Sequence, residues 1–291
     1  MIDSFLNFLQ FEKRFSAHTV TSYRNDLTQF GVYLKENYEE EPASATYAMV
    51  RSWIVSLVEL QMDALTINRK IASLRSYFKF LMRQEVIRKD PMLKIKVLKT
   101  KKKLPHFVNE AEMATMLDKP TFEDNHEGWR ERLILELLYG TGMRLSELIN
   151  LKENQVNLRE QTIRVIGKRN KERVIPFAQP LVLVIQGYLK ARNREVEPND
   201  QGCLIVTNTG GKCYPMMIYR IVTKHLGELA VEKKSPHVLR HTYATHLLNK
   251  GAEINAVKDL LGHSSLAATQ VYTHNSMEKL KKVFDQAHPK A

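Results

Sequence analysis

The sequence predicts a mainly α-helical protein with two domains: a helical N-terminal domain, and a mostly α C-terminal domain that contains one small antiparallel β-sheet. Apolar residues recur at helical spacing along most of the chain, and a strand pattern appears only in the short stretch 162–177. A basic segment with prolines near its ends, residues 86–105, separates the two halves. With 291 residues, of which 43% are apolar, the chain is long enough for two ordinary domains.

The first domain, residues 1–85, is predicted to be helical throughout. One helix follows a Ser16 cap, and a second has Thr66 placed to cap its start. The second helix carries an apolar stripe formed by Ile67, Ile71, Leu74, Phe78 and Leu81. Its opposite side carries Arg69, Ser76, Lys79 and Arg83. Because acidic residues are scarce there, we expect the three basic residues of this side to contact phosphates, with a solvated charged face as the alternative.

The linker, residues 86–105, continues the basic character of this helix. It holds eight Lys and Arg residues against one Asp, with Pro91 and Pro105 near its ends. Its densest run, Lys101, Lys102 and Lys103, is a further candidate for phosphate contact. The first 103 residues carry 18 Lys and Arg against 11 Asp and Glu, and the remainder carries 26 against 21. Both halves are basic, so both are expected to contact the same anion.

The net charge of +12 indicates a polyanionic partner, and nucleic acid is the leading candidate. A membrane surface is the alternative, which we disfavour because the positive residues are spread over the whole chain. The chain has no apolar stretch approaching the roughly 20 residues that span a bilayer, so we expect a soluble, cytoplasmic protein. Cys203 and Cys213 are the only cysteines, which excludes a four-cysteine zinc site and fits a reducing compartment.

In the second domain, helices are predicted at 109–117 and 129–151, then two strands flanking a polar turn, and helices again from Pro215 onward. One of these helices is predicted to begin at Ser235 and Pro236 and to end at Gly251. Its buried stripe is expected to comprise Leu239, Tyr243, Leu247 and Leu248.

The other side of that helix carries His237, Arg240 and His241 within its first turns. Two imidazoles and a guanidinium near a helix start, where backbone N–H groups point outward, are well suited to hold a phosphate. A zinc site formed by His237, His241 and a cysteine is the alternative. We disfavour it because the ligands lack the close pairing typical of zinc sites, and we expect no metal.

Four more residues stand in settings that suit phosphate chemistry. Arg144 directly follows a Gly-Thr-Gly turn, which is one way to bring a guanidinium close to a phosphate. Lys168 lies in the polar turn between the strands. A helix is predicted to stop at Gly262, so that His263 directly follows its end, and Tyr272 comes nine residues later.

In this order, six residues resemble those of the tyrosine recombinase family of site-specific DNA recombinases, and most closely its Xer branch: Arg144, Lys168, His237, Arg240, His263 and Tyr272. The resemblance covers nearly the whole chain. It implies a core-DNA-binding domain at 1–85, a linker at 86–105 and a catalytic domain at 106–291 with the DNA breaking-rejoining enzyme fold.

The resemblance also implies roles for these residues. Arg144 and Arg240 clamp the phosphate, and Tyr272 is the nucleophile that forms a 3′-phosphotyrosyl link. His237 accepts or relays the phenolic proton, and Lys168 protonates the departing 5′ oxygen. Because the covalent link conserves the energy of the broken bond, rejoining through a Holliday junction requires neither ATP nor a metal, and no cofactor is expected.

Three more expectations concern the surroundings of these residues. His263 is expected to hydrogen-bond a non-bridging oxygen, and Glu147, one helical turn after Arg144, to orient that arginine through an ion pair. Where the family often has glycine after the hairpin lysine, this chain has Arg169, which puts the geometry of that turn in doubt.

The end of the chain is predicted to form a helix at 276–287, capped by Ser276. Its narrow apolar stripe comprises Met277, Leu280, Val283 and Phe284. Packing on its own domain is the usual expectation, but the resemblance implies docking in a neighbouring subunit. We therefore expect a homotetramer, or a heterotetramer with a related recombinase, on double-stranded DNA at specific sites. The sequence leaves open whether an accessory translocase switches the activity on.

The predicted function is a site-specific recombinase that resolves chromosome or plasmid dimers, as Xer proteins do in chromosome partition. The chain length leaves no room for an arm-type DNA-binding domain, but a transposon or inversion recombinase shares this layout. A type IB topoisomerase is disfavoured by the short N-terminal domain and the docking-type tail. A non-catalytic DNA-binding regulator is disfavoured because such a protein has no need of a nucleophile.

Overall fold

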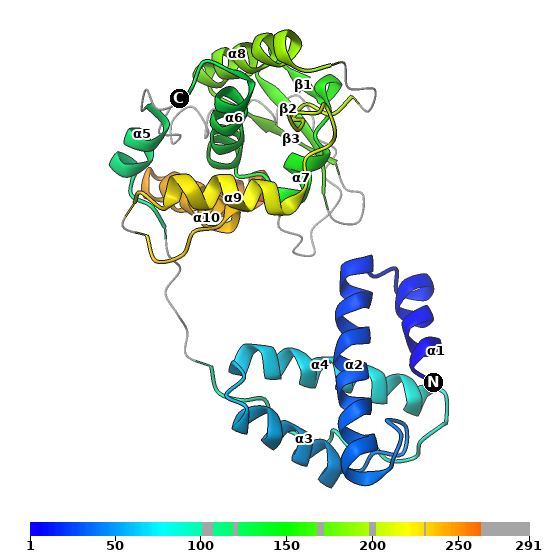
Figure 1. The fold of residues 1–291 in the computed structure, drawn as a ribbon. Coiled ribbons are helices and arrows are strands. Elements are labelled where there is room, and N and C mark those ends of the chain that lie inside the picture. Colours follow the sequence, from blue (N-terminus) through cyan, green and yellow to red (C-terminus); the bar gives the residue numbers. More distant parts are fainter. Residues whose placement is uncertain (101–106, 119–121, 168–171, 198–201, 230, 263–291) are drawn as a thin grey trace. The chain divides into compact units, whose positions relative to one another are not determined.

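A computed structural model describes residues 1–100, 107–118, 122–167, 172–197, 202–229 and 231–262. These residues form eleven α-helices and one three-stranded antiparallel sheet, which confirms the predicted fold class (Figure 1). The chain divides into two compact units, Met1–Lys103 and Leu104–Ala291. None of the helices in the described ranges is long and apolar enough to cross a membrane.

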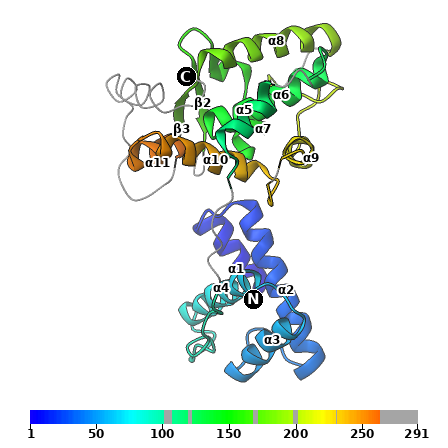
Figure 2. The ribbon, with the colours of Figure 1, turned by 90° about the vertical axis from the view of Figure 1, so that its left-hand side faces the viewer.

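The N-terminal unit consists of four α-helices around one apolar core. These are α1 (Ile2–Asn7), which continues as a π-helical turn (Phe8–Glu12), α2 (Ala17–Tyr38), α3 (Tyr47–Glu59) and α4 (Ala64–Arg83). Helices α2 and α4 contact each other, and both contact α1 and α3 (Figure 2). The predicted apolar stripe of α4 lies in this core, with each of its five side chains at most 1% exposed.

The helix starts of this unit show how capping sets the boundaries. The Ser16 cap is confirmed, since its hydroxyl accepts a hydrogen bond from the backbone N–H of Thr19. The prediction that Thr66 caps α4 is wrong. The helix begins at Ala64, because the Asp63 carboxylate accepts from the backbone N–H of Leu65 at 3.0 Å. An aspartate caps at least as well as a threonine, so the earlier residue takes the position.

A buried charged cluster joins α2 to α4. Asp26 is fully buried, and its carboxylate accepts from Lys70 Nζ at 3.1 Å and from the Ser73 hydroxyl at 2.7 Å. Arg69 donates to the same carboxylate. A buried carboxylate is costly unless it is paired and hydrogen-bonded, so these contacts favour a single register between the two helices.

The second unit is built around helix α6. Its elements are α5 (Glu110–Asp118), α6 (His126–Thr141), α7 (Leu145–Asn150), a 3₁₀ turn (Glu153–Gln155), β1 (Val156–Asn157), β2 (Thr162–Ile166), β3 (Glu172–Pro176), α8 (Gln179–Glu195), α9 (Pro215–Leu226), α10 (Pro236–Asn249) and α11 (Ile254–Leu261). Helix α6 contacts α5, α7, α8, α9 and α10, so it forms the centre of this unit.

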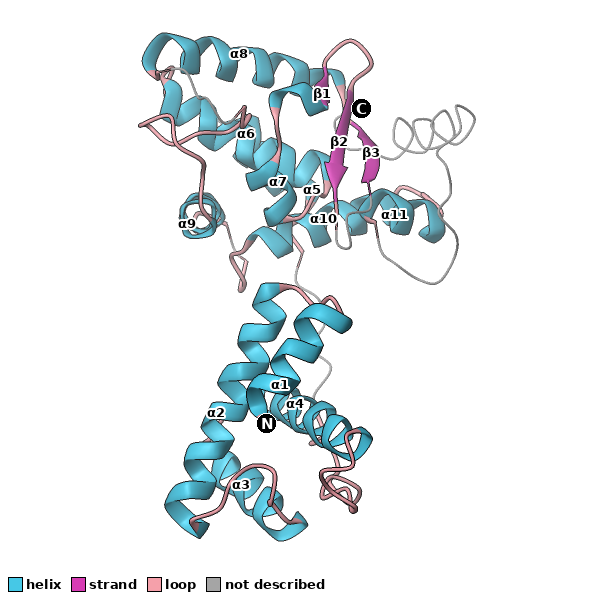
Figure 3. Cartoon of the chain, turned by 90° about the vertical axis from the view of Figure 1, so that its right-hand side faces the viewer, coloured by secondary structure: helices cyan, strands magenta, loops and turns pink. Residues whose placement is uncertain are grey.

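The sheet runs in the order β1-β2-β3 with antiparallel neighbours (Figure 3). In its register Ile163 pairs with Ile175, and Val165 pairs with Arg173. Strand β3 buries Arg173 and Ile175, which lie two residues apart and therefore on the same face. The strand thus places an arginine among buried residues, next to the end of α11, which contacts β3.

Two predictions for this unit are wrong. Helices were expected to return only at Pro215, but Gln179–Glu195 forms α8. Its run of branched apolar residues, 181–185, fits a strand as well as a helix, and packing against α6 decides between them. Leu248, expected in the buried stripe of α10, is 40% exposed. The buried residues Leu239, Tyr243 and Leu247 recur every four residues, and Leu248, one residue further on, points away from their side of the helix.

Candidate active site

The turn between α6 and α7 sets the position of Arg144. Helix α6 ends at Thr141, and Gly142, which follows it, has a φ of 59°. A Cβ atom at this position would lie 2.4 Å from the ring of Tyr243 on α10, so only glycine lets the turn pass so close. The close passage brings the carbonyl oxygen of Gly142 within 2.5 Å of Arg240 Nη1. Arg144 comes two residues after Gly142 and directly before the first residue of α7.

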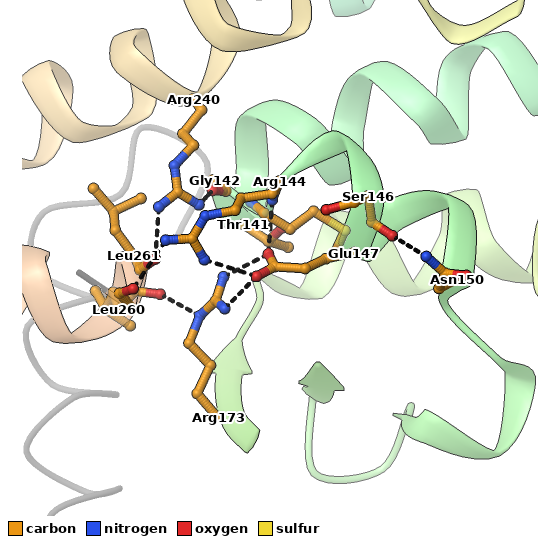
Figure 4. A network of polar contacts seen from close by, with 12 residues as sticks. Thr141, Gly142, Arg144, Ser146, Glu147, Asn150, Arg173, Arg240, Leu260 and Leu261 are labelled. Carbon is orange, nitrogen blue, oxygen red and sulfur yellow. Dashed lines mark hydrogen bonds and ion pairs between the residues drawn. The ribbon is translucent and has the colours of Figure 1, made fainter. Parts of the chain in front are cut away.

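The ion pair expected between Arg144 and Glu147 is present (Figure 4). Arg144 Nη1 donates to Glu147 Oε1 at 2.9 Å, and the backbone N–H of Arg144 donates to Oε2 at 2.7 Å. The same carboxylate therefore both caps the start of α7 and orients the guanidinium of Arg144. Arg144 Nη2 donates to the carbonyl oxygen of Gly262 at 2.9 Å.

Arg240 projects from α10, which begins at Pro236 after Ser235 as predicted. Its Nη2 donates to the carbonyl oxygen of Leu261 at 2.6 Å, in addition to the contact of Nη1 with Gly142. Burial lowers the pKa of Arg240 to about 10, and the charges of Arg144 and Arg173 add to the shift. The side chain remains cationic at neutral pH.

Arg173 was not among the predicted site residues, and the structure places it beside these two arginines. Its Nη1 and Nη2 donate to the two carboxylate oxygens of Glu147 at 2.7 and 2.8 Å, and its Nε donates to the carbonyl oxygen of Leu260 at 2.9 Å (Figure 4). A signal was present in the strand pattern. Arg173 lies two residues before Ile175 and therefore on the same, buried face of the strand. A charged residue on that face requires a partner of opposite charge.

The three arginines share one helix end. The last carbonyl groups of a helix lack intrahelical partners, and the helix dipole makes this end negative. Here three consecutive carbonyl oxygens each accept from a different arginine: Leu260 from Arg173, Leu261 from Arg240 and Gly262 from Arg144. The end of α11 therefore holds all three guanidinium groups in one place. We call Arg144, Arg173 and Arg240 the arginine cluster.

Glu147 is the carboxylate at the centre of the arginine cluster, and it is 5% exposed. Burial by itself raises its pKa, but the hydrogen bonds and charge of Arg173, with the contacts from Arg144, outweigh this effect and hold the pKa below its usual value. Because the folded-state pKa is depressed, this carboxylate stabilises the fold at neutral pH, and the stabilisation is lost as the pH falls through the lowered pKa.

The arginine cluster carries surplus positive charge. The cluster has three guanidinium groups and one carboxylate, Glu147, which pairs with Arg144 and Arg173. The carbonyl oxygens that the arginines also contact bring only partial negative charge. Guanidinium groups bind phosphate through paired N–H donors and stay charged at all ordinary pH values. The arrangement is therefore suited to binding an anion such as a phosphodiester.

The other predicted catalytic residues are only partly described. His237 is exposed in the first turn of α10, three residues before Arg240 and so on the same face, and His241 is half-buried. Lys168, His263 and Tyr272 lie outside the described residues, and so does the predicted terminal helix at 276–287.

The predicted DNA-contacting residues of α4 differ in their surroundings. Lys79 is exposed, and the Arg83 guanidinium lies 5.7 Å from the centre of the Phe8 ring. Arg69 is half-exposed and contacts the buried Asp26, so part of its charge serves the fold. Lys101, Lys102 and Lys103 lie outside the described residues.

Among the residues that the structure covers, no three His, Cys, Asp or Glu side chains gather as metal ligands would.

A stability prediction follows from the turn at Gly142. We expect Gly142→Ala to destabilise the second unit more than Gly251→Ala, its control, which also has a positive φ, of 86°, but has no atom within 4 Å of the added Cβ. The control should cost about 1–2 kcal/mol from backbone strain alone. Overpacking against Tyr243 should add about 1–3 kcal/mol at Gly142.

The measurement for this pair is urea unfolding followed by tryptophan fluorescence. Trp53 and Trp129 are the only tryptophans of the chain, so a Trp53→Phe background leaves Trp129 as the reporter of the second unit. Equal losses of stability in the two variants would contradict the close packing of the turn.

Comparisons with known proteins show the family to which the chain belongs. Residues 89–279 match the phage integrase family, and residues 2–85 match the phage integrase N-terminal SAM-like domain. The chain is 39% identical over 295 residues to a tyrosine recombinase XerC of Staphylococcus carnosus, covering 99% of this chain and 97% of that protein. It is 34% identical over 293 residues to a tyrosine recombinase XerD of Staphylococcus epidermidis, covering 100% and 99%.

Solved structures show the same fold. The chain is similar to the XerH site-specific recombinase bound to palindromic difH substrate, with a TM-score of 0.74, 22% identity and coverage of 97% of this chain and 83% of that one. It is also similar to the Tn1549 transposon integrase in complex with transposon right end DNA, with a TM-score of 0.73, 20% identity and coverage of 97% and 98%.

The fold and the matched domains define a DNA-recombining enzyme, and this chain belongs to the phage integrase family. Within that family it is a tyrosine site-specific recombinase of the Xer type, to which it is similar over its full length.

Proposed function

We propose that this recombinase cuts and rejoins DNA through a transient covalent bond between Tyr272 and a 3′ phosphate. The observation that carries the proposal is the arginine cluster, in which Arg144 and Arg240 are held together with surplus positive charge. The resemblance to the family adds Tyr272 as the nucleophile. A phosphodiester repels a nucleophile, and its transition state spreads further charge over the phosphate oxygens, so two fixed cations stabilise it.

In the proposed reaction the phenolic oxygen of Tyr272 attacks phosphorus, and the bond from phosphorus to the 5′ oxygen breaks. His237 takes or relays the phenolic proton, and Lys168 gives a proton to the departing 5′ oxygen. The products are a 3′-phosphotyrosyl link and a free 5′ hydroxyl. Rejoining is the reverse reaction with the 5′ hydroxyl of another strand. One phosphodiester bond is formed for each one broken, so no external energy source is consumed.

The arginines act on the phosphate in this scheme. Arg144 and Arg240 bind its non-bridging oxygens, and His263 donates a further hydrogen bond. Two observations support the placement of these groups. His263 directly follows Gly262 in the sequence, and the carbonyl oxygen of Gly262 accepts from Arg144. The residue before it, Leu261, accepts from Arg240.

The domain roles follow the same reasoning. We propose that residues 1–85 form a core-DNA-binding domain, that the linker 86–105 follows the DNA backbone and that residues 106–291 form the catalytic domain. The exposed Lys79 and Arg83 on α4 support a phosphate contact by the first domain.

We further propose Xer-like resolution of chromosome or plasmid dimers in the cytoplasm, by a homotetramer or a heterotetramer with a related recombinase. The relatives that are 34–39% identical over nearly the full chain support this assignment, since they are XerC and XerD proteins. A transposon role rests on the Tn1549 integrase, whose 20% identity shows the fold alone. The terminal segment 276–287 is proposed to dock in the neighbouring subunit.

A paired-site assay tests the function. The substrate is a supercoiled plasmid with two copies of a duplex that the protein itself has selected from a randomised pool. The full chain is expected to exchange strands between the two sites, whereas a chain truncated after Ser276 should cut single sites without joining pairs. Relaxation of plasmids that lack the site, with no exchange, would instead support a topoisomerase. Unchanged exchange by the truncated chain would contradict subunit docking through 276–287.

A further inference from the structure

We infer that Arg173 is a positioning residue for strand cleavage, which fixes Arg144 and Arg240 through Glu147 and the end of α11 without touching the DNA. The inference rests on the proposed function, because the phosphate that the two arginines bind is the scissile one. Neither the sequence pattern nor the resemblance to the family identified this arginine.

The contacts of Arg173 show that its role is internal. The residue is 5% exposed, and all three of its guanidinium nitrogens are engaged within the protein. Two nitrogens contact Glu147 and one contacts the carbonyl oxygen of Leu260. By contrast, the side chain of Arg144 is 31% exposed and can reach a ligand.

Arg173 fixes the orientation of Glu147, and Glu147 in turn fixes Arg144. Each carboxylate oxygen accepts from both arginines: Oε1 from Nη1 of each, and Oε2 from Arg173 Nη2 and from the backbone N–H of Arg144. A bidentate contact holds the plane of a carboxylate, whereas a single contact lets it turn. Without Arg173, the contacts described leave the carboxylate held by Arg144 alone, through its backbone N–H and its Nη1, so no other residue fixes the carboxylate that orients this guanidinium.

Arg173 also ties the end of α11 to strand β3. Its Nε holds the carbonyl oxygen of Leu260, and the next two carbonyl oxygens along the chain hold Arg240 and Arg144. A Cβ atom on Gly262 would lie 3.1 Å from Arg173 Cδ, so the helix end packs directly on this side chain. A shift of the helix end would therefore move the acceptors of both phosphate-binding arginines together.

The test is Arg173→Lys, assayed with wild type on nicked DNA that traps the covalent product. Lysine keeps the charge but cannot bond both Glu147 oxygens and the Leu260 carbonyl at once. We expect the rate of adduct formation at saturating DNA to fall about 10²-fold, as a displacement of catalytic groups by about 1 Å does, while DNA affinity stays close to wild type.

A second substrate separates positioning from a general folding defect. In it a neutral methylphosphonate replaces the scissile phosphate, so that less negative charge has to be stabilised by the arginines. The deficit of Arg173→Lys is expected to shrink on this substrate, as that of Arg144→Lys should. A merely structural defect would lower both rates by the same factor.

Arg192→Lys is the matched control. Arg192 also contacts one carboxylate, Glu153, and one backbone carbonyl, that of Leu204, but it lies on α8 and outside the arginine cluster. We expect it to react like wild type on both substrates.

Three outcomes would overturn the inference. They are a wild-type rate for Arg173→Lys on phosphodiester DNA, an equal deficit on the two substrates, and an equal loss in the Arg192→Lys control. If Arg173→Lys does not fold, the double variant Arg173→Gln with Glu147→Gln removes both buried charges together and takes its place with the same expected outcomes. An absence of any adduct with wild type would overturn the proposed function itself, which distinguishes the two failures.

Discussion

Tyr272→Phe is expected to abolish covalent attachment to DNA. Phenylalanine keeps the ring and removes only the oxygen that attacks phosphorus, so folding and DNA affinity should be unchanged. Loss of a nucleophile typically lowers a rate by about 10⁴-fold or more, and here no adduct should be detectable. The measurement is trapping on nicked DNA, with the attached peptide and the DNA end identified by mass spectrometry.

The control for this prediction is Tyr47→Phe, which removes the same oxygen from an exposed tyrosine at the start of α3. It should form the adduct at the wild-type rate. Attachment of wild type through a residue other than Tyr272, or through a 5′ phosphate, would contradict the mechanism, and so would an unimpaired Tyr272→Phe variant.

Arg240→Lys should have the second largest effect, a loss of about 10²–10³-fold in the cleavage rate. A guanidinium has five N–H groups, and the contacts with Gly142 and Leu261 use two of them. The plane of the group is therefore fixed while other N–H groups remain to bind phosphate. A lysine keeps the charge, but its single ammonium cannot hold both carbonyl oxygens and a phosphate in this geometry.

Single-turnover cleavage at saturating DNA measures this loss, with Arg194→Lys as the control. Arg194 contacts Glu195 on the exposed side of α8, and exposed ion pairs contribute little, so its replacement should leave the rate near wild type. A wild-type rate for Arg240→Lys would show that charge alone, without the fixed plane, is what the reaction requires.

The sequence predicted those parts of the fold that local signals determine. The Ser16 cap and the glycine that ends α11 are set by residues close in sequence, and the structure confirms both. Helix α8 was missed because its apolar run fits two kinds of element locally, and only its contact with α6 decides. The start of α4 was misplaced by three residues because two good capping residues, Asp63 and Thr66, stand close together.

The candidate site was predictable only in part for a similar reason. Arg144 and Arg240 stand in distinctive local settings, a Gly-Thr-Gly turn and a helix start, which sequence patterns reveal. Arg173 stands in an ordinary strand, and its partners Glu147 and Leu260 lie 26 and 87 residues away along the chain. The strand pattern indicates only that Arg173 needs a partner of opposite charge, and the folded chain is required to identify that partner.

The three carbonyl groups at the end of α11 also restrict the motion of the arginine cluster. Because they hold the guanidinium groups before any ligand arrives, these long side chains have already lost much of their rotational freedom. Ordering a flexible side chain at a binding site typically costs about 0.5–1.5 kcal/mol. In the proposed mechanism that entropy is lost during folding, so more of the electrostatic attraction to the scissile phosphate would be available to lower the barrier to cleavage.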